Sequence, residues 1–213
     1  HQRRPITGAN RAGTVHHGKA ADIYEFHAKS EGYLAFLGRI SPEKRPDRAI
    51  AIAKRLGKTL KIAAKVDAVD QRYFQDKIEP LILGEPLVQF IGEIGDHQKS
   101  EFLGGADALL FPIDWPEPFG LVMIEAMACG TPVVAYACGS VPEVIEEGVT
   151  GFIVRNEDEA VDAARRAVTL DRARIRQQFE LKYSATAMAR RYLDLYTRLG
   201  APLSQDFAFA ANA

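Results

Sequence analysis

Short apolar runs alternate along most of the chain with longer segments of helical periodicity. The apolar runs occupy residues 33–38, 59–65, 87–92, 108–112, 131–136 and 151–154. Helical spacing follows them at 45–57, 70–83, 96–105, 118–129, 141–148 and from 156 onward. This alternation is typical of βαβ units, whose parallel strands are covered on both faces and are therefore apolar throughout. It predicts an α/β fold: a single doubly wound, Rossmann-like domain over residues 31–183, with a mainly parallel sheet of about six strands.

The two ends of the chain differ from this pattern. Residues 1–30 have no periodicity and are rich in glycine and polar residues, as linkers and turns are. Two further helices are expected at about 171–182 and 184–199, the second capped by Ser184. The tail, 201–213, has little pattern and is expected to be loose. We therefore divide the chain into a segment 1–30, the domain 31–183, and a final helix with its tail over 184–213.

Composition excludes several classes of protein. Hydrophobic residues make up 47% of the 213-residue chain and charged residues 26%, as in soluble globular proteins. A net charge of -1 argues against nucleic acid as a partner, because a phosphate backbone attracts a basic surface. No apolar run is long enough to span a membrane and no secretory signal is visible. The two cysteines, Cys129 and Cys138, form no metal or disulfide pattern, so a reducing, cytoplasmic location is expected.

Unusual residues gather where the predicted strands end. Ligands of doubly wound sheets bind beyond the carboxyl ends of the strands. The first strand leads into Gly38-Arg39-Ile40-Ser41-Pro42-Glu43-Lys44, the second into Lys65, and the third into Gly92 to Ile94. The fourth leads into Asp114-Trp115-Pro116-Glu117-Pro118-Phe119-Gly120. The ligand site is therefore expected at this edge of the sheet.

The segment 118–129 is expected to be a buried helix because Glu125 is its only charged residue. A buried carboxylate is costly unless it is satisfied, and helical side chains lean toward the amino end of the helix. That end presents free N–H groups and a positive dipole, which suit a phosphate. A diphosphate at the helix start and a ribose on Glu125 would satisfy both features. The alternative is a structural ion pair between Glu125 and Arg39 or Lys44.

Several ordered motifs together resemble one enzyme family. These are GRISPEK (38–44), EPFGLVMIE (117–125), AMACGTPVVA (126–135) and GSVPEVIEEGVTGFIV (139–154). They resemble the group 1, or family 4, retaining glycosyltransferases, which have the two-domain GT-B fold. The resemblance covers roughly residues 14–199 and corresponds to the C-terminal, donor-binding domain. It implies a donor that is a UDP-, GDP- or ADP-sugar, with no cofactor and no metal ion.

The resemblance also implies roles for individual residues. Arg39 and Lys44, which follow Gly38, would bind the donor diphosphate, and Glu117 would accept hydroxyls of the transferred sugar. Backbone amides of Phe119 and Gly120 would contact the sugar, and those of Leu121 and Val122 the phosphates. Glu125 would hold the ribose, and the loop from Gly92 to Ile94 would receive the base.

The chain departs from the family pattern at three places. Many relatives have glycine where Pro118 and Ser140 stand, and a glycine-rich loop where this chain has Ala-Ala-Lys-Val-Asp (63–67). We interpret Lys65 as either an extra donor contact or an ordinary lysine at a strand end. His16 and His17 are assigned to a loop without a metal, and Trp115 is expected to pack over its own loop.

A GT-B enzyme has a second domain that binds the acceptor, and only one such domain is present here. We therefore interpret residues 1–30 as the end of a missing N-terminal half plus the connection, and 184–199 as the helix that crosses back to it. The acceptor, a saccharide or lipid, would be bound through that half, as would any peripheral membrane contact. The chain by itself is expected to bind donor and to transfer little or no sugar.

Two other functions stay open: a free-standing nucleotide-binding module and a GT-B sugar-nucleotide epimerase. The segment 117–125 and the later GSVPEV (139–144) favour transfer over epimerisation. An NAD-binding domain is not expected because no G-x-G-x-x-G follows the first strand.

Overall fold

The computed structural model describes residue 8 and residues 12–200. Its centre is a parallel sheet of six strands in the order β3-β2-β1-β4-β5-β6. The strands are β1 (Tyr33–Arg39), β2 (Leu60–Lys65), β3 (Val88–Gly92), β4 (Ala106–Phe111), β5 (Val133–Tyr136) and β6 (Gly151–Val154). This order is that of a doubly wound Rossmann-like domain, so the predicted fold class is confirmed.

β1 lies at the middle of the sheet and pairs with both β2 and β4. Its register with β2 runs from Leu34 opposite Leu60 to Arg39 opposite Lys65. Every residue of β4 and of β5 is buried, as expected for strands covered on both faces. The chain runs from β1 toward one edge of the sheet and returns at β4 to build the other. The carboxyl ends of β1 and β4 therefore flank the crevice in which such folds bind ligands.

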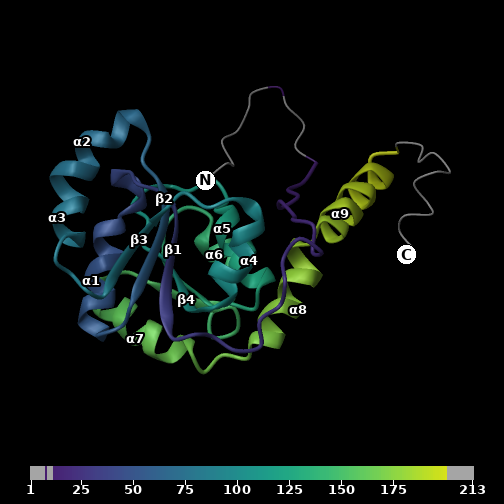
Figure 1. The fold of residues 1–213 in the computed structure, drawn as a ribbon. Helices are drawn as coiled ribbons and strands as arrows, with labels where there is room; N and C mark the ends of the chain where they lie inside the picture. The colour runs from purple at the N-terminus through teal and green to yellow at the C-terminus, as the bar shows by residue number, and fades with distance from the viewer. Residues whose placement is uncertain (1–7, 9–11, 201–213) are drawn as a thin grey trace.

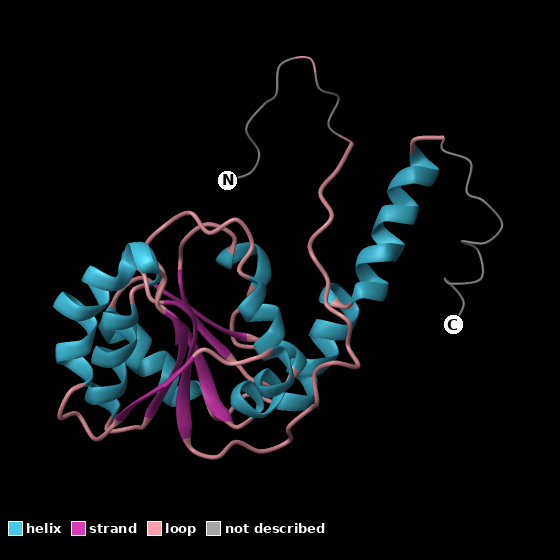
Figure 2. Cartoon of the chain, turned by 45° about the horizontal axis from the view of Figure 1, so that its top comes forward, coloured by secondary structure: helices cyan, strands magenta, loops and turns pink. Residues whose placement is uncertain are grey.

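Helices cover both faces of the sheet, as Figures 1 and 2 show. One face carries α1 (Pro46–Leu56), α7 (Glu157–Ala167) and the segment formed by α2 (Gln71–Tyr73), η3 (Phe74–Ile78) and α3 (Glu79–Ile82). The other carries α4 (Asp96–Gly104), α5 (Leu121–Ala128), α6 (Val141–Val144) and α8 (Arg172–Tyr183). Short 3-10 turns stand at η1 (Pro42–Lys44) and η2 (Ala68–Asp70). The last helix, α9 (Ala185–Arg198), extends away from the sheet (Figure 1).

The predicted helices form with three main differences. The segment 141–148 is helical only over Val141–Val144. The segment 70–83 contains a π-helical stretch, Phe74–Ile78, between two short α-helical pieces. The helix expected from residue 118 begins only at Leu121, so the prediction of its start was wrong. Gly120 has φ +77°, a left-handed conformation that a right-handed helix cannot include, and Pro118 and Phe119 therefore lie in the preceding loop.

Polar side chains cap the amino ends of the later helices, as expected. The side chain of Asn156 accepts from Glu159 N at 2.9 Å at the start of α7. Ser184 accepts from Ala187 N at 3.1 Å at the start of α9, which confirms its predicted capping role. In the described part of the chain no helix is long and apolar enough to cross a membrane. The expected loose tail, 201–213, lies outside the described residues.

The segment from residue 12 to residue 30, called the strap below, runs back over the helices of the second face. Arg176 of α8 donates to the carbonyls of Tyr24, Ala128 and Ala21 at 2.8, 2.6 and 3.1 Å. Arg172 donates to His27 O at 2.7 Å. These two guanidinium groups fasten the strap to the domain.

Candidate functional site

A pocket of about 430 Å³ opens at the carboxyl ends of β1 and β4, in the crevice that the sheet order predicts. The loop after β1 forms one wall and the loop leading into α5 forms the other. Its lining residues are His17, Leu37, Gly38, Arg39, Lys44, Phe111, Glu117, Pro118, Phe119, Gly120, Leu121 and Val122. The structure thus brings together both predicted cations, Glu117 and the residues that begin α5.

An ion pair joins the two walls of this pocket. Lys44 Nζ lies 2.5 Å from Glu117 Oε2, and the two side chains are only 17% and 11% exposed. The indole N–H of Trp115 donates to the same oxygen at 2.9 Å. Lys44 Nζ also lies 5.3 Å from the centre of the Trp115 ring, within the range of a cation–π interaction. Trp115 therefore packs over its loop, as expected, and in addition orients Glu117.

Tight backbone contacts fix the loop before α5. Gly139 has φ +57°, and a Cβ there would lie 2.3 Å from Glu117 N and 2.4 Å from Glu117 O. Ser140 N donates to Glu117 O at 3.0 Å, and the Ser140 hydroxyl donates to Phe119 O at 2.7 Å. Only a glycine at position 139 lets the loop after β5 approach the loop that contains Glu117 so closely.

The amino end of α5 faces the pocket, since Leu121 and Val122 are among its lining residues. The first N–H groups of a helix have no acceptor within the helix and carry a partial positive charge. No acidic residue lies in the first turn of α5 and no basic residue in its last. The arrangement of N–H groups and two cations around one space is suited to an anion.

Arg39 is half exposed and is paired with carboxylates on its own side of the sheet. Its guanidinium lies 3.4 Å from Glu43 Oε1 and 3.5 Å from Asp67 Oδ2. Lys65 forms an ion pair with Asp67 at 3.1 Å, and this pair raises the pKa of Lys65 and lowers that of Asp67. Lys65 is not among the residues that line the pocket. Both interpretations of it, a donor contact and an ordinary lysine at a strand end, stay predictions.

Glu125 lies one turn beyond Val122 on the same side of α5 and is 95% buried by its neighbours on the strap and α4. Its Oε1 is 2.8 Å from Lys19 Nζ and 3.5 Å from Lys99 Nζ, and it accepts from the Tyr24 hydroxyl at 3.0 Å. Burial, and then the Glu125 charge, raise the pKa of Tyr24, which keeps its hydroxyl a donor. The suggested pairing of Glu125 with Arg39 or Lys44 was wrong, because the strap folds back and supplies Lys19 instead.

The pocket is also lined by His17, which the sequence analysis assigned to a loop without a metal. The His17 ring meets the Phe119 ring edge-on with centroids 5.1 Å apart, and His16 lies 3.3 Å from Glu143 Oε2. No sequence signal marks this position, because the strap lacks periodicity and His17 reaches the pocket only through the tertiary fold. Gly92, the last residue of β3, and Ile94 in the loop after it were predicted for the base and do not line the pocket.

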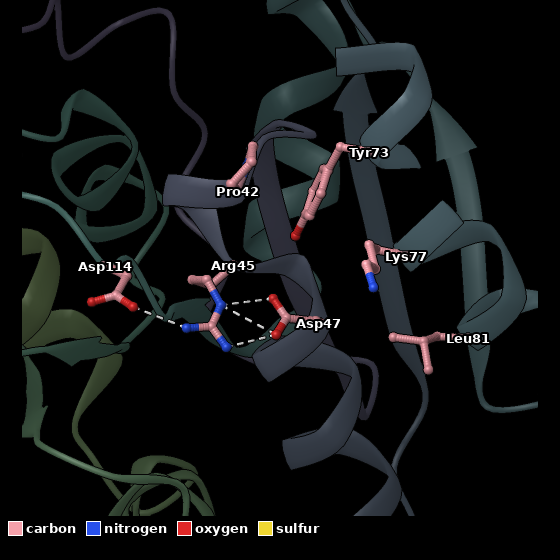
Figure 3. A pocket seen from close by; sticks show the side chains of 7 residues that line it. All are labelled: Pro42, Arg45, Asp47, Tyr73, Lys77, Leu81 and Asp114. Atoms are coloured by element: carbon pink, nitrogen blue, oxygen red, sulfur yellow. Dashed lines mark hydrogen bonds and ion pairs between the residues drawn. The ribbon is translucent and has the colours of Figure 1, made fainter. Parts of the chain in front are cut away.

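A second cavity, of about 570 Å³, lies on the other side of η1 (Figure 3). Arg45 stands at its centre with φ +53°, the one non-glycine residue with positive φ in the described chain. Its guanidinium is held by Asp47 at 2.7 Å and Asp114 at 2.9 Å. Since none of the predicted site residues line this cavity and its arginine is already paired twice, we place the functional site in the smaller pocket.

The sheet order, the helices on both faces and the crevice between β1 and β4 define a doubly wound, Rossmann-like domain. The sequence profile of the family described as glycosyl transferases group 1 matches residues 22–181. The chain therefore belongs to the group 1 glycosyl transferases, as its motifs predicted.

Curated relatives include the D-inositol 3-phosphate glycosyltransferases of Mycobacterium tuberculosis and Mycobacterium bovis. Each is 30% identical over an alignment of 174 residues, and the match covers 73% of this chain and 34% of the relative. The chain thus spans about a third of the length of these curated relatives.

Solved structures give the same picture. AviGT4, a glycosyltransferase involved in avilamycin A biosynthesis, superimposes with a TM-score of 0.77 at 27% identity, over 92% of this chain and 60% of that one. Alr3699/HepE from Anabaena in complex with UDP superimposes with a TM-score of 0.75 at 20% identity, over 87% and 57%. The second likeness concerns the fold alone.

Proposed function

We propose that this chain binds the donor of a sugar-transfer reaction, a nucleoside-diphosphate sugar, in the pocket between β1 and α5. The observation that carries the proposal is the convergence of Arg39, Lys44 and the amino end of α5 on one space of about 430 Å³. Two cations and a helix terminus are a suitable environment for a pyrophosphate. Membership of the glycosyl transferases group 1 supports the same function.

The diphosphate would lie on the N–H groups of Leu121 and Val122, with Arg39 and Lys44 on its other side. When the bond between the sugar and the diphosphate breaks, negative charge grows on the leaving phosphate. Fixed donors and cations already aimed at that charge stabilise the transition state electrostatically. These groups therefore serve both donor binding and bond cleavage.

The transferred sugar would lie beside Glu117. Its carboxylate is 11% exposed and is held by Lys44 and Trp115, so it offers its remaining lone pairs in a fixed direction. The ribose would reach Glu125, one turn further along α5, and the base the loop from Gly92 to Ile94. Neither Glu125 nor this loop is among the residues that line the pocket.

We further propose that transfer requires a second domain, with the acceptor bound between the two. The chain corresponds to 57–60% of the length of the glycosyltransferase structures reported above. Transfer from donor to an acceptor hydroxyl would retain the configuration at the sugar carbon, as the family resemblance implies. We expect this chain alone to bind donor but to transfer little or no sugar.

Calorimetry with UDP, GDP and ADP, each alone and as its glucose conjugate, tests the proposal. Lys44→Met and Arg39→Ala should each weaken binding about tenfold or more, because a charge-assisted hydrogen bond contributes about 1.5–3 kcal/mol. Arg72→Ala, which removes a side chain that is 93% exposed, is the matched control and should bind as the unmodified chain does. Binding that is insensitive to both pocket substitutions, or absent for all three bases, would show that the assignment is wrong.

A further inference from the structure

The strap reaches the proposed ribose carboxylate through two side chains, those of Lys19 and Tyr24, and of these only Lys19 carries a charge. The Lys19 ammonium is 2.8 Å from Glu125 Oε1, and its side chain is 26% exposed. Lys99, the other cation on this oxygen, is 3.5 Å away and is also held by Asp96 at 2.8 Å. Although burial lowers the pKa of Lys99, Asp96 and Glu125 together raise it, so Lys99 stays charged in place. Among the described residues, Lys19 has no second carboxylate within ion-pair distance.

The backbone of Lys19 is tied to a different part of the molecule, the junction between α8 and α9. Lys19 N donates to Tyr183 O at 2.9 Å, and Ala185 N donates to Lys19 O at 2.8 Å. A Cβ on the neighbouring Gly18 would lie 2.4 Å from Ser184 O, so the strap and the junction lie in direct contact. Lys19 therefore connects Glu125, by its side chain, to the start of α9, by its main chain.

Beyond this junction the strap and α9 leave the sheet together, as Figure 1 shows for the purple strap and the yellow helix. A Cβ on Gly13 would lie 3.3 Å from the Leu195 side chain, which places the start of the strap beside α9. On α9, Tyr192, Tyr196 and the adjoining Leu199 are 41%, 46% and 58% exposed. The junction is thus the point where the chain passes from the domain body to its protruding part.

We propose that Lys19 couples donor binding at Glu125 to the attachment of the strap and α9 to the domain. The inference rests on the proposed function, in which ribose hydroxyls donate to Glu125. They and the Lys19 ammonium compete for the same carboxylate, while Lys99 and Tyr24 remain to satisfy it. Donor binding displaces the Lys19 side chain, and the main-chain bonds of Lys19 at the junction are weakened.

Because thermodynamic coupling is reciprocal, detachment of the strap and α9 must also change the affinity for the donor. Any contact that draws the strap and α9 away from Glu125 removes the competing ammonium and strengthens donor binding by the same factor. A partner that binds the exposed face of α9 and draws it away would therefore raise the affinity for the nucleotide without contacting the nucleotide.

The test compares UDP binding by the unmodified chain, Lys19→Met, Lys19→Arg and Lys29→Met. Methionine keeps an unbranched apolar side chain and removes the ammonium, so Lys19→Met should bind UDP about tenfold more tightly, a coupling of ordinary size. Lys19→Arg should behave as the unmodified chain. Lys29→Met, which removes an exposed strap lysine, controls for the change in net charge.

Hydrogen exchange at the amides of Lys19 and Ala185 gives a second readout. In the unmodified chain UDP should lower the protection of both amides several-fold, whereas in Lys19→Met protection should be low with or without UDP. Equal or weaker UDP binding by Lys19→Met, or exchange that does not respond to UDP, would overturn the coupling while leaving the donor site intact. Failure of every variant to bind any nucleotide would overturn the donor site and the coupling together. If Lys19→Met does not fold, Lys19→Gln replaces it with the same expectations.

Discussion

Replacing Arg172 by methionine should destabilise the domain strongly, because one guanidinium holds four acceptors that belong to separate elements. Its N–H groups donate to His27 O at 2.7 Å, Ala106 O at 2.9 Å, Gly104 O at 2.6 Å and Thr131 Oγ1 at 2.8 Å. They join the strap, the end of α4, the start of β4 and the turn before β5. Burial lowers the pKa of Arg172, but as a guanidinium it keeps its charge.

The magnitude follows from the bonds that are lost. At about 1 kcal/mol net for each of the four, Arg172→Met should lower the free energy of unfolding by about 4 kcal/mol. Arg172→Lys keeps the charge, but a single ammonium cannot span the four acceptors. We expect it to cost about half as much. Arg174→Met is the control: this exposed arginine lies two residues further along α8, and its loss should change stability by less than about 0.5 kcal/mol.

Urea denaturation followed by circular dichroism measures these differences. The denaturant slope should stay the same, because the surface exposed on unfolding is unchanged. A loss below about 1 kcal/mol for Arg172→Met, or a loss no larger than that of Arg174→Met, would refute the idea that this arginine fastens the four elements.

Three further outcomes follow from the structure. Gly139→Ala should lower the free energy of unfolding by several kcal/mol and abolish nucleotide binding, because its Cβ would lie 2.3 Å from Glu117 N. Gly148 also has positive φ but open space around it, so Gly148→Ala should cost only about 1 kcal/mol in thermal or urea denaturation. Burial raises the pKa of Cys129 to about 12, so at pH 8 a thiol reagent should modify the half-buried Cys138 in the native chain and both cysteines only in urea; equal native rates would contradict this. Burial tends to raise the pKa of Asp47, but its guanidinium partner holds it below the ordinary value. The stability it contributes is present above the unfolded pKa of about 3.9 and is lost as pH falls through the folded pKa, so Asp47→Asn should cost more in urea at pH 7 than at pH 3.

The sheet could be predicted from sequence because each strand is a short apolar run between helical segments. The buried β4 and β5 are clear examples, since burial on both faces leaves no polar position in them. The start of α5 was placed too early because Pro118 suits a first helical turn, and nothing in the local sequence reveals that Gly120 adopts positive φ. The π-helical stretch at Phe74–Ile78 likewise leaves no distinct periodicity.

The site could be predicted only in part. Gly38, Arg39 and Lys44 follow one strand and Glu117 another, so the rule that strand ends meet at one edge brings them together. Lys19 and Lys99 could not be found as partners of Glu125, because they lie far from it in sequence. Their proximity depends on how the strap, which has no periodicity, folds over α5.

Neither terminal turn of α5 carries the charged residue that would complement the helix dipole. This feature limits how the domain can be stabilised. Adding an acidic residue to the first turn of a helix is a standard route to greater stability and yields about 0.3–1 kcal/mol. Leu121, the first residue of α5, is 44% exposed and would accept glutamate without disturbing the core. Yet the new carboxylate would lie at the amino end of α5, where we place the diphosphate, and would repel that diphosphate. At this one position a gain in thermostability would therefore lower the proposed affinity for a nucleotide, and selection for stability alone would weaken it further.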